Sequence, residues 1–527
     1  MIRTPLLRAL QRALREAATS STRREFLKEA SVIGATALAF PSLSKAATLL
    51  DTTHQQAGRN GDKVFILGGG VSGLVAAYTL QKAGIQSVVY EGSSRLGGRV
   101  FTLENFNDEG MFCELGGELL DSDHTDTLTL AEELGLGIDD FRSGDQGIEP
   151  FHFYFGGKHY YEKDLVEPFK PMAKHFQEDL KDLFADPATQ VINYSTATEK
   201  AKKLDLIPLS TYLDQMTDVE EWVRELMRVA YIAEYGLEAE DQSAISLLML
   251  MPDMSPGFRP YGTSDECKRI KGGNSNLVKA LLEKLKGKVD VHVDRRLTKI
   301  ERNGSQFQLS FRSGDQHHTH IANQVICTIP FSILRSIEGI ETLGLTPRKL
   351  ACIREFGYGK NSKHMLGFNR RVWREGDRKS TGLTFTNLSS QCFWETSRSQ
   401  PGTQGILTNF LGGQNANQIS SRDTVLQELE LIYPGAQSAF NGKETQFNWG
   451  EHAWSKGSYS SPKIGQMTQL MGCQAEPEFE GNLLFAGEHV SEAFIGFING
   501  AVETGQNAAK MMAALRKKTA TRRHAVA

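Results

Sequence analysis

The sequence predicts an α/β protein, and three observations support this prediction. Two short apolar runs, 64–67 and 87–90, have the composition of buried parallel strands. Between them, apolar residues recur at helical spacing, and this helical pattern ends at Gly84. Two further runs of the buried-strand kind occur at 325–329 and 483–485, so strand-forming segments are spread along the chain.

The first strand is followed directly by the pattern G-x-G-x-x-G. Gly68 allows a tight turn, Gly70 lets the backbone approach a pyrophosphate, and Gly73 lets the helix pack closely against the strand. The second strand stops at Glu91, where an acid can accept hydrogen bonds from ribose hydroxyls. A glycine turn that binds no phosphate is the alternative, but strand, glycines, helix, strand and acid in this order predict a dinucleotide site.

A second glycine pair follows Glu91. Gly98 and Arg99 belong to a Gly-Gly-Arg segment, and Thr102 comes shortly after it. An arginine here can neutralise a pyrophosphate with its planar fork of donors. In this extended pattern, E-x(5)-G-G-R-x-x-T, the chain resembles the FAD-dependent amine oxidase family. The resemblance implies that the dinucleotide is FAD rather than NAD.

The resemblance extends from residue 62 to residue 515 and implies two domains, each discontinuous in sequence. It implies an FAD-binding domain of the Rossmann type and an α+β substrate domain. The FAD-binding domain is expected to comprise residues 62–120, 266–331 and 446–515, and the substrate domain residues 121–265 and 332–445.

The same resemblance assigns the cofactor-binding residues. The Gly116–Gly117 pair passes beside the flavin, although an ordinary turn is the alternative. Glu488 approaches the ribityl chain, and the helix that begins near Ile498 directs its N-terminal dipole at the flavin pyrimidine edge. The implied residues are Gly68, Gly70, Val71, Ser72, Gly73, Glu91, Gly98, Arg99, Gly116, Gly117, Glu118, Val293, Trp449, Gly487, Glu488, Phe497, Ile498 and Ala501.

Three residues are implied as catalytic. Lys363 matches the family lysine whose amine holds a water against flavin N5; the alternative is an unremarkable lysine on an edge strand. Tyr459 and Phe497 match two aromatic positions whose ring faces align an amine beside the flavin, although aromatic residues are more often core packing. Ser458 stands where the animal enzymes attach FAD through cysteine, which implies non-covalent FAD.

The implied reaction is oxidative deamination of a primary or secondary amine, with oxygen as acceptor and hydrogen peroxide as product. The close alternative is an L-amino-acid oxidase, which needs a cation for the substrate carboxylate; Arg398 is the candidate. A distant alternative is a non-catalytic FAD-binding factor. The net charge of −4 gives no reason to expect a nucleic acid partner.

The N-terminal region differs from the rest. Residues 22–28 match the twin-arginine export pattern around Arg23 and Arg24, and an apolar stretch and small residues follow. We therefore expect a signal peptide at 1–46, a linker at 47–61, recognition by the twin-arginine machinery, and a bacterial protein in the periplasm or secreted. No apolar run is long enough to span a bilayer.

The six cysteines are dispersed, and their spacing predicts neither a metal site nor a disulfide, so buried free thiols are expected. Residues 516–527 are expected to form a solvated, disordered basic tail. The sequence leaves the oligomeric state open, with a homodimer as one arrangement.

Overall fold

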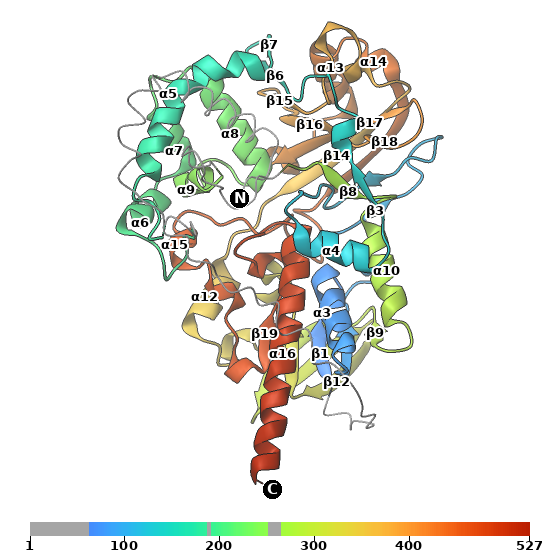
Figure 1. Ribbon diagram of the computed structural model, residues 1–527, viewed down its shortest axis with the longest axis vertical. Helices are drawn as coiled ribbons and strands as arrows, with labels where there is room; N and C mark the ends of the chain where they lie inside the picture. The colour runs from blue at the N-terminus through green and yellow to red at the C-terminus, as the bar shows by residue number, and fades with distance from the viewer. Residues whose placement is uncertain (1–62, 187–190, 251–264, 527) are drawn as a thin grey trace.

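The computed structural model describes residues 63–186, 191–250 and 265–526. The described chain has two halves, each organised around a sheet (Figure 1). The expected signal peptide and linker, 1–61, lie outside the described residues. None of the described helices is both long enough and apolar enough to cross a membrane.

The first half contains a five-stranded, wholly parallel sheet. Its strands come from three distant segments of the chain, as the resemblance implies. Because both faces of this sheet are covered, its three central strands are buried along their whole length, which explains the hydrophobic runs in the sequence. In spatial order the strands are β19 (Leu483–Phe485), β13 (Gln324–Cys327), β1 (Val64–Leu67), β2 (Ser87–Tyr90) and β9 (Asp290–His292).

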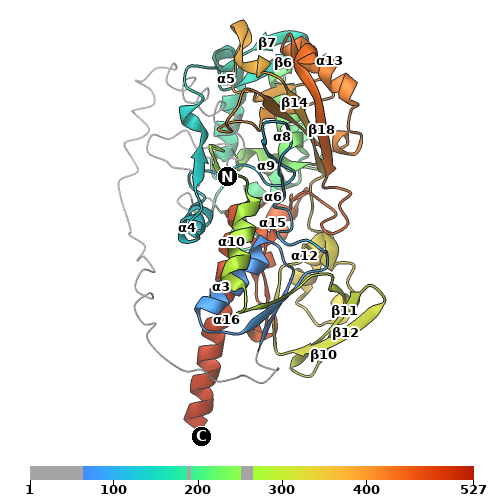
Figure 2. The same cartoon turned by 90° about the vertical axis from the view of Figure 1, so that its right-hand side faces the viewer.

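Helices cover one face of the parallel sheet, and a small antiparallel sheet covers the other (Figure 2). The helices are α3 (Val71–Lys82), α10 (Ser275–Leu285) and α16 (Ile498–Val526). The small sheet consists of β10 (Arg296–Asn303), β11 (Gln306–Ser313) and β12 (Gln316–Ala322). Tyr90 of β2 stacks on Phe311 of β11 with ring centroids 4.6 Å apart, which joins the two sheets.

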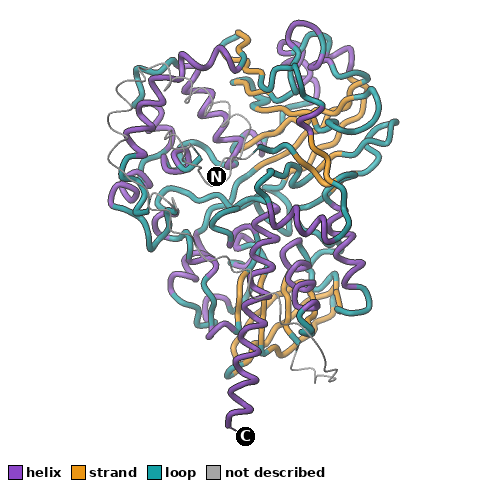
Figure 3. The backbone as a smooth tube through the Cα atoms, viewed as in Figure 1, coloured by secondary structure: helices purple, strands orange, loops and turns teal. Residues whose placement is uncertain are grey.

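The second half contains a seven-stranded mixed sheet beside a group of helices, drawn in Figure 3 as orange and purple tubes. In spatial order the strands are β18 (Phe440–Asn448), β14 (Asn361–Phe368), β17 (Gly405–Gly412), β16 (Cys392–Glu395), β15 (Thr384–Thr386), β6 (His152–Phe155) and β7 (Lys158–Tyr160). The helices are α5 (Glu162–Leu180), α6 (Glu199–Asp205), α7 (Leu209–Asp214), α8 (Glu221–Tyr235), α9 (Ala244–Leu248), α13 (Arg422–Ile432) and α14 (Ala436–Ala439).

The remaining elements are short. They are α4 (Thr125–Glu133), α11 (Phe331–Leu334), α12 (Pro347–Glu355), α15 (Gln466–Gln469) and the two-stranded pairs β3 (Thr102–Leu103) with β4 (Cys113–Glu114) and β5 (Ile138–Asp140) with β8 (Lys268–Ile270). The 3₁₀ turns are η2 (Phe141–Ser143), η3 (Ile340–Thr342), η4 (Val372–Arg374), η5 (Gly376–Arg378), η6 (Asn415–Asn417), η7 (Cys473–Ala475), η8 (Phe479–Gly481) and η9 (Glu488–Val490). Strand β18 runs across the expected boundary between residues 445 and 446.

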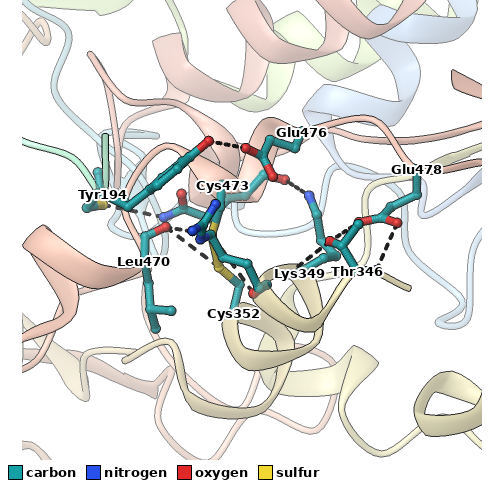
Figure 4. The surroundings of a disulfide bond; sticks show 11 residues. Tyr194, Thr346, Lys349, Cys352, Leu470, Cys473, Glu476 and Glu478 are labelled. Atoms are coloured by element: carbon teal, nitrogen blue, oxygen red, sulfur yellow. Dashed lines mark hydrogen bonds between the residues drawn. A yellow bond between two sulfur atoms is a disulfide. The ribbon is translucent and has the colours of Figure 1, made fainter. Parts of the chain in front are cut away.

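Two sequence expectations are wrong at the level of the fold. Residues 516–526 continue α16 instead of forming a disordered tail, because the segment has neither glycine nor proline (Figure 1). Cys352 and Cys473 form a disulfide that joins α12 to η7, 121 residues apart in sequence (Figure 4). The other four cysteines are buried free thiols, as expected.

Candidate active site

A cavity of about 730 Å³ is lined by residues of both halves. Every residue that the resemblance assigns to the site lines it, except Gly73 and Val293. Gly73 has the packing role that the motif gives it, since a Cβ built there would lie 2.0 Å from the carbonyl oxygen of Gly68. The chain after β9 places Arg295 rather than Val293 against the cavity, where the Arg295 N–H donates to the Glu91 carbonyl (2.8 Å).

One end of the cavity is built from backbone. No side chain caps the N-terminus of α3, and the buried Ser72 hydroxyl has no hydrogen-bond partner among the described residues. A Cβ built at Gly98 would lie 3.2 Å from the Cα of Gly70, so a side chain at Gly98 would crowd the first glycine turn. The uncapped N–H groups at the start of α3 and the Ser72 hydroxyl can donate hydrogen bonds to a pyrophosphate.

Glu91 is fixed by backbone donors at the same end. Its carboxylate accepts hydrogen bonds from the N–H groups of Gly69 (2.7 Å) and Ser93 (2.8 Å). Beside it, the ring of Trp454 lies so close to Gly92 that a Cβ built there would be 2.5 Å from the ring. Trp454 also lines the cavity and is 37% exposed. We call this region, where the ribose and phosphates of a dinucleotide would lie, the nucleotide end.

An ion pair crosses the middle of the cavity. Arg99 Nη1 lies 2.6 Å from Glu488 Oε1 and also donates to the Ser458 carbonyl (3.1 Å). Glu488 accepts further hydrogen bonds from Ser460 and from the Gly496 N–H (2.8 Å). Burial opposes ionisation of Glu488, but the Arg99 charge holds the pKa of this carboxyl below its usual value. The pair therefore joins three distant segments around the cavity.

The Gly116–Gly117 turn lies beyond this ion pair. A Cβ built at Gly116 would lie 1.9 Å from the Arg99 carbonyl oxygen, and one at Gly117 would lie 3.1 Å from the Ile498 side chain. Trp449 Nε1 donates to the Leu115 carbonyl (2.6 Å). Only glycine fits at Gly116, and a side chain at Gly117 would crowd Ile498, so the backbone of this turn faces the cavity.

Lys363 is buried in β14, the second strand of its sheet, so the edge-strand alternative is wrong. Its Nζ donates to the carbonyls of Glu114 (3.0 Å) and Gly116 (2.9 Å) and to Glu118 Oε2 (3.0 Å). These three acceptors use all three ammonium hydrogens. The role of this amine in holding a water stays a prediction.

The two expected aromatic residues lie at the same end as Lys363, which we call the inner end. Tyr459 and Phe497 both line the cavity. The Tyr459 hydroxyl donates to the Glu234 carbonyl, which anchors the ring to α8. The centroid of the Phe497 ring lies 4.8 Å from that of the ring of buried His124. Both rings are therefore held in place by neighbouring elements.

A family model described as flavin-containing amine oxidoreductase matches residues 71–513, more than half of the chain. The chain belongs to this family. Members of the family contain a flavin and act on amines, so the protein is an FAD-dependent oxidoreductase of amines, and the nucleotide end described above has the donors that FAD needs. Ser458, whose hydroxyl donates to Asn361 Oδ1 (2.6 Å), leaves no thiol for covalent attachment at that position.

Individual relatives agree with this assignment. The flavin-dependent L-tryptophan oxidase RebO of Lentzea aerocolonigenes is 27% identical, over 86% of this chain and 99% of that protein. Flavin-containing amine oxidase B of the dog, Canis lupus familiaris, is 23% identical, over 85% of each chain. The structure of cyclohexylamine oxidase from Brevibacterium oxydans is similar with a TM-score of 0.72 at 19% identity, covering 87% of this chain and all of that one.

Most residues that line the inner end of the cavity, which together we call the inner wall, are not among those that the family resemblance assigns. This wall is formed by residues of α8 and of strands β15, β16 and β17. Two alanines of α8 line the cavity. Alternation in β16 places positions 392 and 394 on one face, and this pattern is the signal that sequence reasoning did not use. The additional residues are Ala230, Ala233, Glu234, Glu266, Leu383, Phe385, Cys392, Trp394 and Phe410.

Proposed function

We propose that the protein oxidises an amine to an imine with oxygen as electron acceptor, releasing hydrogen peroxide, and that water then hydrolyses the imine. The observation that carries this proposal is the continuity of the cavity, from the nucleotide end to a compartment of aromatic rings. When FAD is bound, it supplies the group that accepts the hydride equivalent. Tyr459 and Phe497 hold the amine in place with their ring faces, and the buried position excludes water.

The walls of the inner end favour a substrate with an apolar body. Phe385 on β15 and Phe410 on β17, the strands on either side of β16, contribute apolar side chains to the cavity, as does Leu383, which directly precedes β15. Burial, together with the carboxylates of Glu266 and Glu234, raises the pKa of the Cys392 thiol well above its usual value, so this thiol is neutral. A primary or secondary amine with an alkyl or aryl group fits this surface.

The L-amino-acid oxidase alternative depends on Arg398, which lines the cavity. Arg398 Nη1 already pairs with Asp145 (3.2 Å), and its guanidinium lies 4.4 Å from the Phe141 ring centre. A charge that is paired in this way is a weaker partner for a substrate carboxylate than a free one. This contact favours amines over amino acids.

Matched substrate pairs test both functions. Tryptamine against L-tryptophan and phenethylamine against L-phenylalanine differ only in the carboxylate, so a peroxide assay reads the contribution of that group directly. We expect peroxide from the amines and at least tenfold less from the amino acids. Faster turnover of the amino acids would establish the alternative, and flavin that no member of either series reduces would favour a non-catalytic FAD-binding factor. Acid precipitation should also release all FAD into the supernatant.

We also propose that the protein is exported through the twin-arginine route to the periplasm or beyond. The Cys352–Cys473 disulfide supports this proposal, because disulfides persist in oxidising compartments. Arg23→Lys combined with Arg24→Lys should retain the protein in the cytoplasm, since the receptor reads the arginine pair. An unchanged periplasmic yield of this double variant would exclude the route.

A further inference from the structure

A buried cluster of charged and polar side chains closes the inner end of the cavity. We call Glu118, Lys363, Arg269 and Trp394 the Glu118 cluster. Glu118 Oε2 accepts hydrogen bonds from Lys363 Nζ and from Trp394 Nε1, both at 3.0 Å. Glu118 Oε1 lies 3.6 Å from Arg269 Nη1 and has no hydrogen-bond partner among the described residues. One carboxylate therefore faces two cations.

Arg269 is fixed independently of Glu118. Its side chain is 1% exposed, and its two terminal nitrogens donate to the carbonyls of Thr396 and Arg398, both at 2.9 Å. The guanidinium also lies 4.6 Å from the ring centre of Phe112. Because these contacts hold Arg269 rigidly, its position does not adjust when the charge of Glu118 changes.

The cluster has a net positive charge. Two cations and one carboxylate leave one positive charge among side chains that are at most 6% exposed, where electrostatic interactions are stronger than in water. Burial opposes ionisation of Glu118, but the charges of Lys363 and Arg269 hold its pKa below its usual value, so the carboxylate is ionised. Removing that one carboxylate charge would double the net charge of the cluster.

We propose that Glu118 is a positioning residue that fixes the ammonium of Lys363 and offsets its charge, and so sets how strongly the inner end stabilises negative charge on the flavin ring. Lys363 donates to the carbonyl of Gly116, within the turn that faces the cavity, so its position is coupled to a surface that bound FAD would contact. The inference deepens the proposed function and rests on it only in that FAD occupies the cavity.

The FAD-loaded protein can be tested with sulfite as an anionic probe. The sulfite lone pair forms a bond to the electron-poor ring of oxidised flavin, and the ring takes up the negative charge, which bleaches its visible absorbance. A larger positive charge nearby should strengthen this binding. Glu118→Gln keeps the shape and the acceptor oxygen, and should tighten sulfite binding at least tenfold. Lys363→Met should weaken it at least tenfold, and the double variant should fall between the two.

Controls separate charge from shape. Glu104→Gln removes an exposed carboxylate that pairs with Lys279 away from the cavity, and should leave sulfite binding unchanged. Glu118→Asp keeps the charge and provides a second variant in case Glu118→Gln does not retain FAD; its sulfite affinity should stay within about threefold of the parent.

Unchanged or weaker sulfite binding in Glu118→Gln with FAD retained, or a tenfold change in Glu118→Asp, would overturn the inference. Because the titration uses no amine, failure of every amine to react would contradict the proposed function and leave this test valid.

Discussion

The two ends of the cavity present different chemical groups to a bound molecule. At the nucleotide end, the groups are mainly backbone: the uncapped N-terminus of α3 and the glycines of two adjacent turns. At the inner end they are side chains, chiefly those of the Glu118 cluster, in which Glu118 accepts hydrogen bonds from Lys363 on β14 and Trp394 on β16. Backbone groups are fixed by the fold, whereas each side chain at the inner end depends on a partner. Substitutions should therefore change cofactor affinity at one end and reactivity at the other.

The largest effect is expected for Arg99→Ala. The substitution removes the one side-chain cation that pairs with Glu488 among the described residues, and leaves that buried carboxylate without a counter-charge. We expect FAD affinity to fall by about 100-fold or more, because charge-assisted hydrogen bonds and buried ion pairs are expensive to break. Equilibrium titration of the apoprotein with FAD measures this. Lys279→Ala, at an exposed pair, is the control, and FAD affinity equal in the two variants would contradict a role of the Arg99–Glu488 pair in FAD binding.

The next effect is a change in pH dependence for Glu114→Gln. Burial raises the pKa of Glu114 to about 7, so between its unfolded value and pH 7 the native state binds a proton that the unfolded chain has released. The stability that this proton contributes is therefore present at low pH and is lost as pH rises toward 7. Glu114→Gln should remove this pH dependence, which amounts to about 1–3 kcal/mol in the free energy of unfolding. Urea unfolding between pH 5 and pH 8 measures it, and parallel curves for both proteins would refute it.

A smaller effect, at the inner end, is expected for Lys363→Met. FAD affinity should remain within about threefold of the parent, because the backbone contacts of the nucleotide end are intact. Reoxidation by oxygen should slow by about tenfold, more than anaerobic reduction by an amine, because the positive charge that stabilises the developing anion is lost. Stopped-flow measurement of the two half-reactions tests this. Lys360→Met, at an exposed lysine nearby, is the control; equal reoxidation rates in both variants would show that Lys363 does not assist oxygen.

The smallest effect is expected for Trp454→Ala, which removes an aromatic side chain from the nucleotide end. Loss of its ring beside Gly92 should speed FAD release by about fivefold, which corresponds to about 1 kcal/mol of packing. Recovery of flavin fluorescence after dilution measures the release rate. Trp454→Phe should retain most of the slow release, and a release rate in Trp454→Ala equal to that of the parent would mean that Trp454 does not contact the cofactor.

The same contrast explains what the sequence could predict. Glycine turns, helix starts and strand ends leave local patterns, so the parallel sheet, α3 and most residues of the nucleotide end could be predicted from them, although Arg295 rather than Val293 lines the cavity. The Glu118 cluster has no such pattern, because Arg269, Glu118 and Lys363 meet only through tertiary packing. Lys363 was found through the family, but its three acceptors could not be, since two of them are carbonyls with no sequence signature.

Pairings between distant residues were also beyond sequence reasoning. The Cys352–Cys473 disulfide spans 121 residues, and nothing in the spacing of six dispersed cysteines selects this pair. The continuation of α16 was available from composition, because residues 516–526 include no helix-breaking residue, but their high charge suggested disorder instead.

The ion pair between Arg99 and Glu488 also has a consequence for the order of events during synthesis. The two residues are 389 positions apart, and β19, which completes the parallel sheet, precedes Glu488 by only a few residues. At typical rates of 5–20 residues per second, about 20–80 s separate the emergence of the first glycine turn from that of its last partner. Throughout that interval the glycine turns of the ribosome-bound chain lack both β19 and Glu488, so they cannot retain FAD firmly. Cofactor retention therefore marks completion of the chain, and a nonsense truncation before β19 should yield a protein without flavin.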